Sequence, residues 1–335
     1  MEQFPELPLI PSLPDDLTID IVARVPISHY PTLSLVSKSF RKLIAASPKL
    51  YKRRSQLGIT QHRVYAILRN SKAHEFSFYI LHNLNGYNRL DRVRSLPLIS
   101  SFALNTCCVS VGSKLYVFSE NSALSVDCTS HKLQSIPDIP DPISHRQVNA
   151  IGKKVHLLGD TFCDVVTEKG WSKGFRKAVA VFDTETQSWE PTLVNEDLNE
   201  FREIHCDSCV MEDKIFLKVM GGYVCVVDGV LYAYGHIEKT LVAFDPKQGY
   251  WSVVNGLKEF FALETSWWYN AVNYGPNKLA LFFPKTLNNE NDVTFCAEVA
   301  LERRQGGEIW GEVQCCDIVI SDELLQTVKL VAVTV

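Results

Sequence analysis

Residues 108–118 read Cys-Val-Ser-Val-Gly-Ser-Lys-Leu-Tyr-Val-Phe, an apolar strand, a tight polar turn and a second apolar strand. The same unit recurs at residues 150–159, 209–217, 225–235 and 272–281. From about Arg63 onward, runs typical of short strands are separated by Gly, Asp, Asn or Pro turns, and helical periodicity is almost absent. We therefore expect this long part of the chain to be all-β.

Two of these units continue in a way that predicts an outer hairpin. Trp189 follows Asp183 by six residues, and Trp251 follows Asp245 at the same spacing. An aspartate can start a turn by accepting hydrogen bonds from the backbone that follows it, and a tryptophan on the next strand supplies a large packing surface. Asp127, followed by a leucine, is a degenerate third copy.

The spacing of the units indicates the architecture. The turn positions are separated by 40, 60, 16 and 48 residues, and they are Lys114, Lys154, Lys214, Val230 and Lys278. Repeats of about 40–50 residues, each a four-stranded antiparallel unit, are typical of a β-propeller. The step of 16 residues cannot contain two outer strands. We expect about five to six blades, with the unit at 209–220 truncated, and ring closure beside that unit stays open.

Before residue 60 the pattern is helical. Leu17, Ile21 and Val25 lie four residues apart, and the next apolar stripe consists of Leu33, Val36, Phe40, Leu43 and Ile44. Capping and proline signals predict three short helices at 15–24, 30–45 and 48–56. A head of about 45 residues is too small to bury a core of its own. Either a partner protein or the chain's own body must cover it.

Composition and charge limit the partners. The chain carries 34 Lys and Arg against 38 Asp and Glu, so it has no overall field that attracts nucleic acid or anionic membranes. The start of the sequence is acidic and interrupted by proline, unlike a signal peptide, and no apolar run is long enough to span a bilayer. We expect an intracellular protein of the cytoplasm or nucleus, with no membrane contact.

One segment departs from this balance. Residues 21–74 contain no Asp or Glu and eleven Lys and Arg. The segment indicates an acidic partner, while nucleic acid and a simply solvated helix face are the competing interpretations.

The sequence contains no motif from which we expect catalysis, cofactor binding or metal binding. The sequence has no Gly-rich phosphate loop and no Gly-x-Ser-x-Gly elbow. The Cys-x2-Cys pair of Cys206 and Cys209 has no second pair at the spacing that structural zinc requires. The cysteines are expected to be reduced, and the adjacent pairs at 107–108 and 315–316 are each expected to bury one thiol.

With these motifs in place, a family resemblance can be stated. Residues 13–17, 25–26, 30–41 and 47–51 resemble an F-box, and the β-rich body resembles the kelch repeats of plant F-box/kelch-repeat proteins, with their C-terminal signature at 295–304, 307–311 and 330–335. The Gly-Gly pair of kelch blades is replaced by Ser119-Glu120, Gly159-Asp160 and Gly235-His236. The resemblance implies a multidomain protein, with a three-helix F-box at 9–58 and a kelch-type β-propeller at 60–335.

The resemblance also implies a function. Such a chain is a non-catalytic substrate-recognition subunit of an SCF-type cullin-RING ubiquitin ligase, which docks on a Skp-type adaptor and holds a target protein. Carried over by position, the adaptor contacts are Leu13, Pro14, Leu17, Ile21, Val25, Pro26, Leu33, Val36, Ser37, Lys38 and Leu43. The alternative for Leu33, Val36 and Leu43 is that they only pack the helices together.

Target binding is expected on loops of the propeller. The candidates are two long polar insertions, 160–176 and 195–207, with Trp171, Arg176 and Arg202 as possible anchors. Trp171 could instead pack on its own blade. Two other functions stay open: a kelch scaffold without ligase function and, more distantly, an oxidase, since some kelch-type propellers are secreted copper oxidases.

Overall fold

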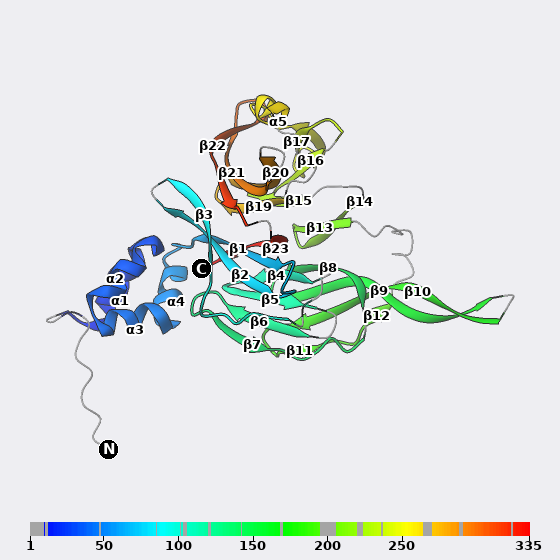
Figure 1. The fold of residues 1–335 in the computed structure, drawn as a ribbon, viewed down its shortest axis with the longest axis horizontal. Helices are drawn as coiled ribbons and strands as arrows, with labels where there is room; N and C mark the ends of the chain where they lie inside the picture. The colour runs from blue at the N-terminus through cyan, green and yellow to red at the C-terminus, as the bar shows by residue number, and fades with distance from the viewer. Residues whose placement is uncertain are drawn as a thin grey trace, which may run out of the picture.

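The structure is a computed structural model of the 335-residue chain. It describes residues 10, 13–46, 48–84, 86–100, 102, 106–119, 122–141, 143–167, 170–194, 206–219, 224–235, 237–263, 270–287, 291–322 and 324–335. A group of short helices lies at one side of a larger assembly of β-sheets (Figure 1).

The helical head contains four α-helices where three were predicted, and a short 3-10 helix in addition. It consists of α1 (Asp15–Arg24), the short 3-10 helix η1 (Ile27–His29), α2 (Tyr30–Val36), α3 (Lys38–Ala46) and α4 (Pro48–Gln56). The predicted single helix at 30–45 is wrong, because the chain turns extended at Ser37, with φ −158° and ψ 165°. The Ser37 Oγ accepts a hydrogen bond from the Phe40 N–H at 3.1 Å. Ser37 therefore ends α2 and caps α3.

A buried arginine joins these helices. Arg54 on α4 is 1% exposed, and its Nη1 donates to the carbonyl oxygens of Ala23 and Val25, both at 2.7 Å. The same nitrogen lies 3.3 Å from the Tyr30 hydroxyl, and the guanidinium lies over the Tyr30 ring at 5.6 Å. Cations at a helix C-terminus satisfy carbonyls that have no partner within the helix. Arg54 therefore fixes the end of α1 against α2 and α4.

The β-part forms five blades of four or more strands and one short hairpin among the described residues. The first blade contains β23 (Leu325–Thr334), β1 (His62–Asn70), β2 (Phe76–Leu84) and β3 (Tyr87–Arg92), in that order from the inside. The second contains β4 (Cys107–Val111), β5 (Lys114–Phe118), β6 (Ala123–Asp127) and β7 (Lys132–Ser135). The third contains β8 (Ser144–Ile151), β9 (Lys154–Thr167), β10 (Gly170–Asp183) and β11 (Ser188–Trp189), with β12 (Leu193–Val194) also paired to β10.

The short hairpin follows, with β13 (Cys206–Met211) and β14 (Lys214–Val219). The fourth blade contains β15 (Val224–Val227), β16 (Val230–Gly235), β17 (Thr240–Asp245) and β18 (Tyr250–Val253). A short helix, α5 (Lys258–Leu263), leads to the fifth blade, which contains β19 (Asn270–Gly275), β20 (Lys278–Leu287), β21 (Asn291–Arg303) and β22 (Ile309–Ile320). The predicted propeller with one truncated unit is confirmed.

The five repeated sequence units are all antiparallel hairpins, each made of an innermost strand and its neighbour. The outer hairpins also follow the predicted frame: Asp183 Oδ1 accepts the N–H groups of Glu185 at 2.8 Å and Thr186 at 3.0 Å. The ring of Trp189 packs on Phe182 of its own blade at 5.0 Å and on Phe118 of the second blade at 5.8 Å. This tryptophan therefore connects two neighbouring blades.

The ring is closed, with the short hairpin as one of its members. Going round the ring, β4 contacts β8, β8 contacts β13, β13 contacts β15, β15 contacts β19, and β23 contacts both β19 and β4. The outer strands of the fifth and first blades are also joined, because the Asn88 N–H donates to the Asp317 carboxylate at 2.8 Å. The short hairpin thus occupies a ring position, and no outer strand pairs with it among the described residues (Figure 1).

The helical head shares its core with the propeller. One cluster of buried side chains runs from Val22, Tyr30 and Leu50 of the helices into Tyr65 and Val117 of the first two blades. The chain's own propeller therefore covers one side of the helical head.

The third blade carries a long projection. Strands β9 and β10 are 14 residues each, and they pair continuously from Lys154↔Asp183 to Thr167↔Gly170. The insertion at 160–176, predicted as a loop, is therefore a two-stranded ribbon that extends away from the ring (Figure 1). Such a ribbon has no face that must pack on a core, so its sequence does not need the apolar alternation by which strands are recognised.

Candidate functional site

The helices present large apolar side chains to solvent. Leu17 and Ile21, four residues apart on α1, are 53% and 51% exposed, and at the end of α2 Leu35 and Val36 are 75% and 66% exposed. We call these four residues the exposed helical surface. Leu35 was not among the predicted contacts, because it lies next to the stripe that the helical period selects. Such side chains on short helices beside a complete core indicate a protein-binding surface.

The other predicted adaptor contacts differ in accessibility. Pro14, Pro26 and Lys38 are exposed, whereas Leu13, Val25, Leu33 and Ser37 are half-buried. Leu43 is only 7% exposed and belongs to the shared core, so in this structure it packs the helices together rather than facing a partner. Leu33 packs partly against the same core, and Val36 faces solvent. As adaptor contacts, all eleven residues stay predictions.

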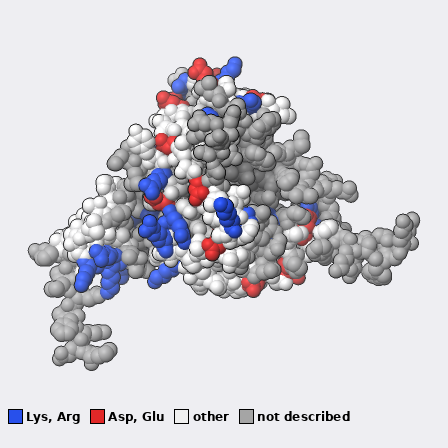
Figure 2. Space-filling model, viewed as in Figure 1, with Lys and Arg blue, Asp and Glu red and all other residues white. Residues whose placement is uncertain are grey.

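The basic segment is partly neutralised within the head. Asp20, one residue before the segment begins, accepts hydrogen bonds from Arg53 at 2.6 Å and Arg24 at 3.1 Å, and these bonds hold the pKa of its carboxyl below the usual value. Lys38 and Arg41 are exposed on α3. Figure 2 shows Lys and Arg gathered over the helices and over the neighbouring region of β3. Positive charge therefore continues from the head onto the first blade.

The predicted target anchors fall on the long ribbon or outside the described residues. Arg176 is exposed on β10, next to Phe175, which is 60% exposed and was not predicted. Trp171 lies on β10 opposite Val166 of β9; its side chain is outside the described part of the structure. Arg202 also lies outside the described residues.

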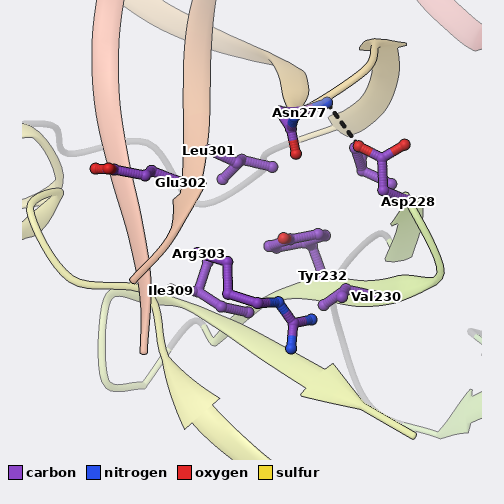
Figure 3. Close-up of a pocket in the computed structure, with 9 residues that line it drawn as sticks. Asp228, Val230, Tyr232, Asn277, Leu301, Glu302, Arg303 and Ile309 are labelled. Carbon is purple, nitrogen blue, oxygen red and sulfur yellow. Dashed lines mark hydrogen bonds between the residues drawn. The ribbon is translucent and has the colours of Figure 1, made fainter. Parts of the chain in front are cut away.

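The propeller contains a small pocket between its fourth and fifth blades. Asp228, Tyr232, Asn277 and Arg303 are among the residues that line it, and the Asp228 carboxylate accepts the Asn277 N–H at 2.6 Å (Figure 3). Its volume of about 60 Å³ has room for water but not for a substrate. A much larger cleft lies where the helices meet the propeller.

Eight of the ten cysteines have side chains that the structure describes, and none of these eight forms a disulfide. Cys107 and Cys108 are both buried, and burial raises their pKa to about 11 and about 12. The expectation of one buried thiol per adjacent pair is wrong, because β4 is an inner strand with blades on both faces, whereas on the outer strand β22 Cys315 is half-buried and Cys316 is exposed. No group of three or more His, Cys, Asp or Glu within the described ranges is arranged to hold a metal ion.

Comparison with known proteins agrees with this architecture. Residues 10–52 match the F-box domain, and residues 218–320 match the FKB95, kelch-repeats domain. In Arabidopsis thaliana, F-box/kelch-repeat protein At4g38940 is 32% identical over 96% of this chain and 94% of its own length. Putative F-box/kelch-repeat protein At3g10510 of the same organism is 32% identical over 94% of this chain and 93% of its own length.

The fold and its exposed surfaces thus define an F-box joined to a kelch β-propeller, which is the substrate-adaptor type of F-box protein. The chain belongs to the F-box/kelch-repeat proteins. Among the residues that the structure describes, no helix has the length and apolar character needed to cross a membrane.

Proposed function

We propose that this chain is the substrate-recognition subunit of an SCF-type cullin-RING ubiquitin ligase. The observation that carries the proposal is the exposed helical surface of Leu17, Ile21, Leu35 and Val36, which lies on the F-box and is not covered by the propeller. Fully burying one such side chain contributes about 1.5–3 kcal/mol. All four side chains are at least half exposed, so their burial against a Skp-type adaptor would stabilise the complex.

The two domains have separate tasks in this proposal. The F-box, proposed at residues 9–58, binds the adaptor and through it the cullin-RING ligase, while the propeller, proposed at 60–335, binds a protein target. The chain supplies no catalytic residue and no cofactor; it contributes proximity, because it keeps a target lysine near the charged ubiquitin carrier. Such a complex operates in the cytoplasm or the nucleus and leads to proteasomal degradation of the target.

Charge on the head supports the choice of partner. The exposed Lys38 and Arg41 face solvent on the F-box, and an acidic adaptor would be attracted to them. Electrostatic attraction of this kind mainly raises the association rate and is weakened by salt. The adaptor complex is therefore expected to form more slowly as the ionic strength increases.

The long ribbon of the third blade is the proposed target-binding element. It projects from the ring and carries exposed Phe175 and Arg176 on β10. Aromatic and arginine side chains are enriched among the residues that dominate protein interfaces. Trp171 on the same strand and Arg202 in the following segment are further proposed anchors.

The test uses the full chain and a purified Skp-type adaptor. The double variant Leu35→Ser/Val36→Ser removes exposed apolar surface from the F-box, and Ile237→Ser, at a side chain that is 90% exposed on the propeller, is the matched control. We expect the double variant to weaken adaptor binding about tenfold or more and the control to leave it unchanged.

Circular dichroism of each variant reports folding. A folded wild-type chain that does not bind the adaptor would refute the ligase proposal and would favour the scaffold alternative. Deletion of the head is a poorer test, because the helices share a core with the first two blades and their removal exposes it.

A further inference from the structure

A large cleft lies between the F-box and the propeller. Its volume is about 1130 Å³, and its lining comes from the helices, from the first blade, and from the β6–β7 and β19–β20 turns. The helices contribute Tyr30 and Arg41, for example, and the fifth blade contributes Tyr274 and Lys278. Clefts of this kind between two domains are preferred sites for small ligands.

The charge of the lining is one-sided. Five cations line the cleft, Arg41, Arg63, Arg92, Arg94 and Lys278, against one carboxylate, that of Asp91. The excess is four positive charges, five minus one.

Most of this excess is not compensated by partners of opposite charge. The single carboxylate, Asp91, is occupied by Arg89, whose Nε lies 2.8 Å away. Arg92, Arg94 and Lys278 are exposed and form no ion pair with any residue that the structure describes. Like charges that share a cleft repel one another, and a bound anion would remove that repulsion.

Neutral hydrogen-bonding groups lie among the cations. His62, His82 and His131 line the same cleft. The His131 ring nitrogen Nε2 lies 3.0 Å from the Tyr65 hydroxyl, and burial, helped by the Arg63 charge, lowers the pKa of this imidazole to about 4. His131 is therefore uncharged at neutral pH and can donate or accept a hydrogen bond without adding to the repulsion.

We propose that this cleft binds a small, multiply charged anion of the polyphosphate class, which contacts the F-box and the propeller together. Four of the five cations are arginines, and a guanidinium binds phosphate oxygens in pairs. The cations come from α3, β1, the end of β3 and the start of β20, so one charge cannot reach them all. A ligand with several phosphate groups matches this distribution better than a single carboxylate does.

The place of the ligand implies its effect. Because Arg41 belongs to the F-box and Lys278 to the fifth blade, a ligand that binds both would add a second link between the head and the ring, beside the core that they share. In a receptor, the orientation of the head relative to the ring sets the distance between the two bound proteins. The binding itself does not depend on the proposed ligase function.

The test measures binding of inorganic tripolyphosphate to the full chain by isothermal titration calorimetry. The cleft variant is Arg92→Gln/Arg94→Gln, and the charge-matched control is Lys72→Gln/Lys258→Gln, at two exposed lysines outside the cleft. We expect one tripolyphosphate per chain, an affinity about tenfold or more lower in the cleft variant, and an unchanged affinity in the control.

Thermal unfolding and a second ligand distinguish the possible results of this titration. All four substituted side chains are exposed, so thermal unfolding without ligand should be the same in every variant; if the cleft variant unfolds early, Lys278→Gln replaces it. Equal weakening by the cleft and control variants, several tripolyphosphates per chain, or no binding at low salt would overturn the proposal. Binding of an oligoglutamate peptide but not of tripolyphosphate would also overturn it and would assign the cleft to an acidic protein segment.

Discussion

Replacing Arg54 by Met should destabilise the F-box strongly. The substitution removes the donor that bonds the carbonyl oxygens of Ala23 and Val25, both at 2.7 Å, and it removes the charge over the Tyr30 ring. A buried carbonyl left without a partner costs about 1–3 kcal/mol, and the cation–π contact contributes about 1 kcal/mol.

An opposing effect lowers the total. The Arg54 Nε and Nη2 atoms are buried without a hydrogen-bond partner among the described residues, and Met relieves that desolvation cost. The net expectation is a loss of about 3 kcal/mol in the free energy of unfolding. Arg54→Lys should lose less, because an ammonium group retains the charge but not the planar geometry.

The assay is equilibrium denaturant unfolding of the full chain, followed by far-UV circular dichroism and by adaptor binding. The neighbouring Arg53→Met is the matched control: its side chain is 41% exposed and pairs with Asp20 at the surface, so its loss should be much less destabilising. If Arg54→Met is no less stable than Arg53→Met, the buried guanidinium does not hold the end of α1 and the reasoning fails.

Three further predictions concern the propeller. In thermal unfolding, Trp189→Ala should lower the free energy of unfolding by about 3 kcal/mol, because Trp189 packs on two blades, and Trp251→Ala should lower it by about 1 kcal/mol, because Trp251 is 49% exposed. Equal losses in the two variants would contradict the contact between the blades. The pKa of His131 is lowered in the folded state to about 4. Its contribution to the free energy of unfolding should therefore be fully present above about pH 6.5 and be lost toward pH 4, by at most about 1.4 kcal/mol per pH unit. His131→Gln should flatten this slope when unfolding is measured as a function of pH. Among the eight described thiols, Cys316 should react first with a thiol reagent in the native chain, whereas Cys108 should react only on unfolding; rapid labelling of Cys108 would show that β4 is accessible.

The repeated strand–turn–strand units could be predicted from sequence because each is local. The turn and both strands lie within about a dozen residues, so the pattern contains all the groups that form the hairpin. The same holds for Asp183 and its turn. The 16-residue step likewise predicted the truncated unit, since chain length alone excludes two further strands.

Other features depend on contacts that sequence periodicity does not report. The break at Ser37 depends on one side chain that caps the next helix, and the apolar stripe continues across it unchanged. The sequence also did not show which side chains of the head are buried, because Leu43 in the core and Val36 at the surface are both aliphatic and both lie on the predicted apolar stripe. Pairing of β23 with β1 joins segments more than 250 residues apart, which no local pattern can indicate.

The pairing of β23 with β1 has a consequence for biosynthesis. About 260 residues separate the two strands, so β1 leaves the ribosome long before its inner partner is made. Val333, at the end of β23, lies in the same cluster of buried side chains as Val22 and Leu50 of the helices. Until β23 has been synthesised, the first blade lacks its innermost strand and the helical core lacks part of its cover, a state with exposed apolar surface that chaperones bind. A premature stop codon before β23 would leave every other blade intact and still yield a chain unfit to bind its partners.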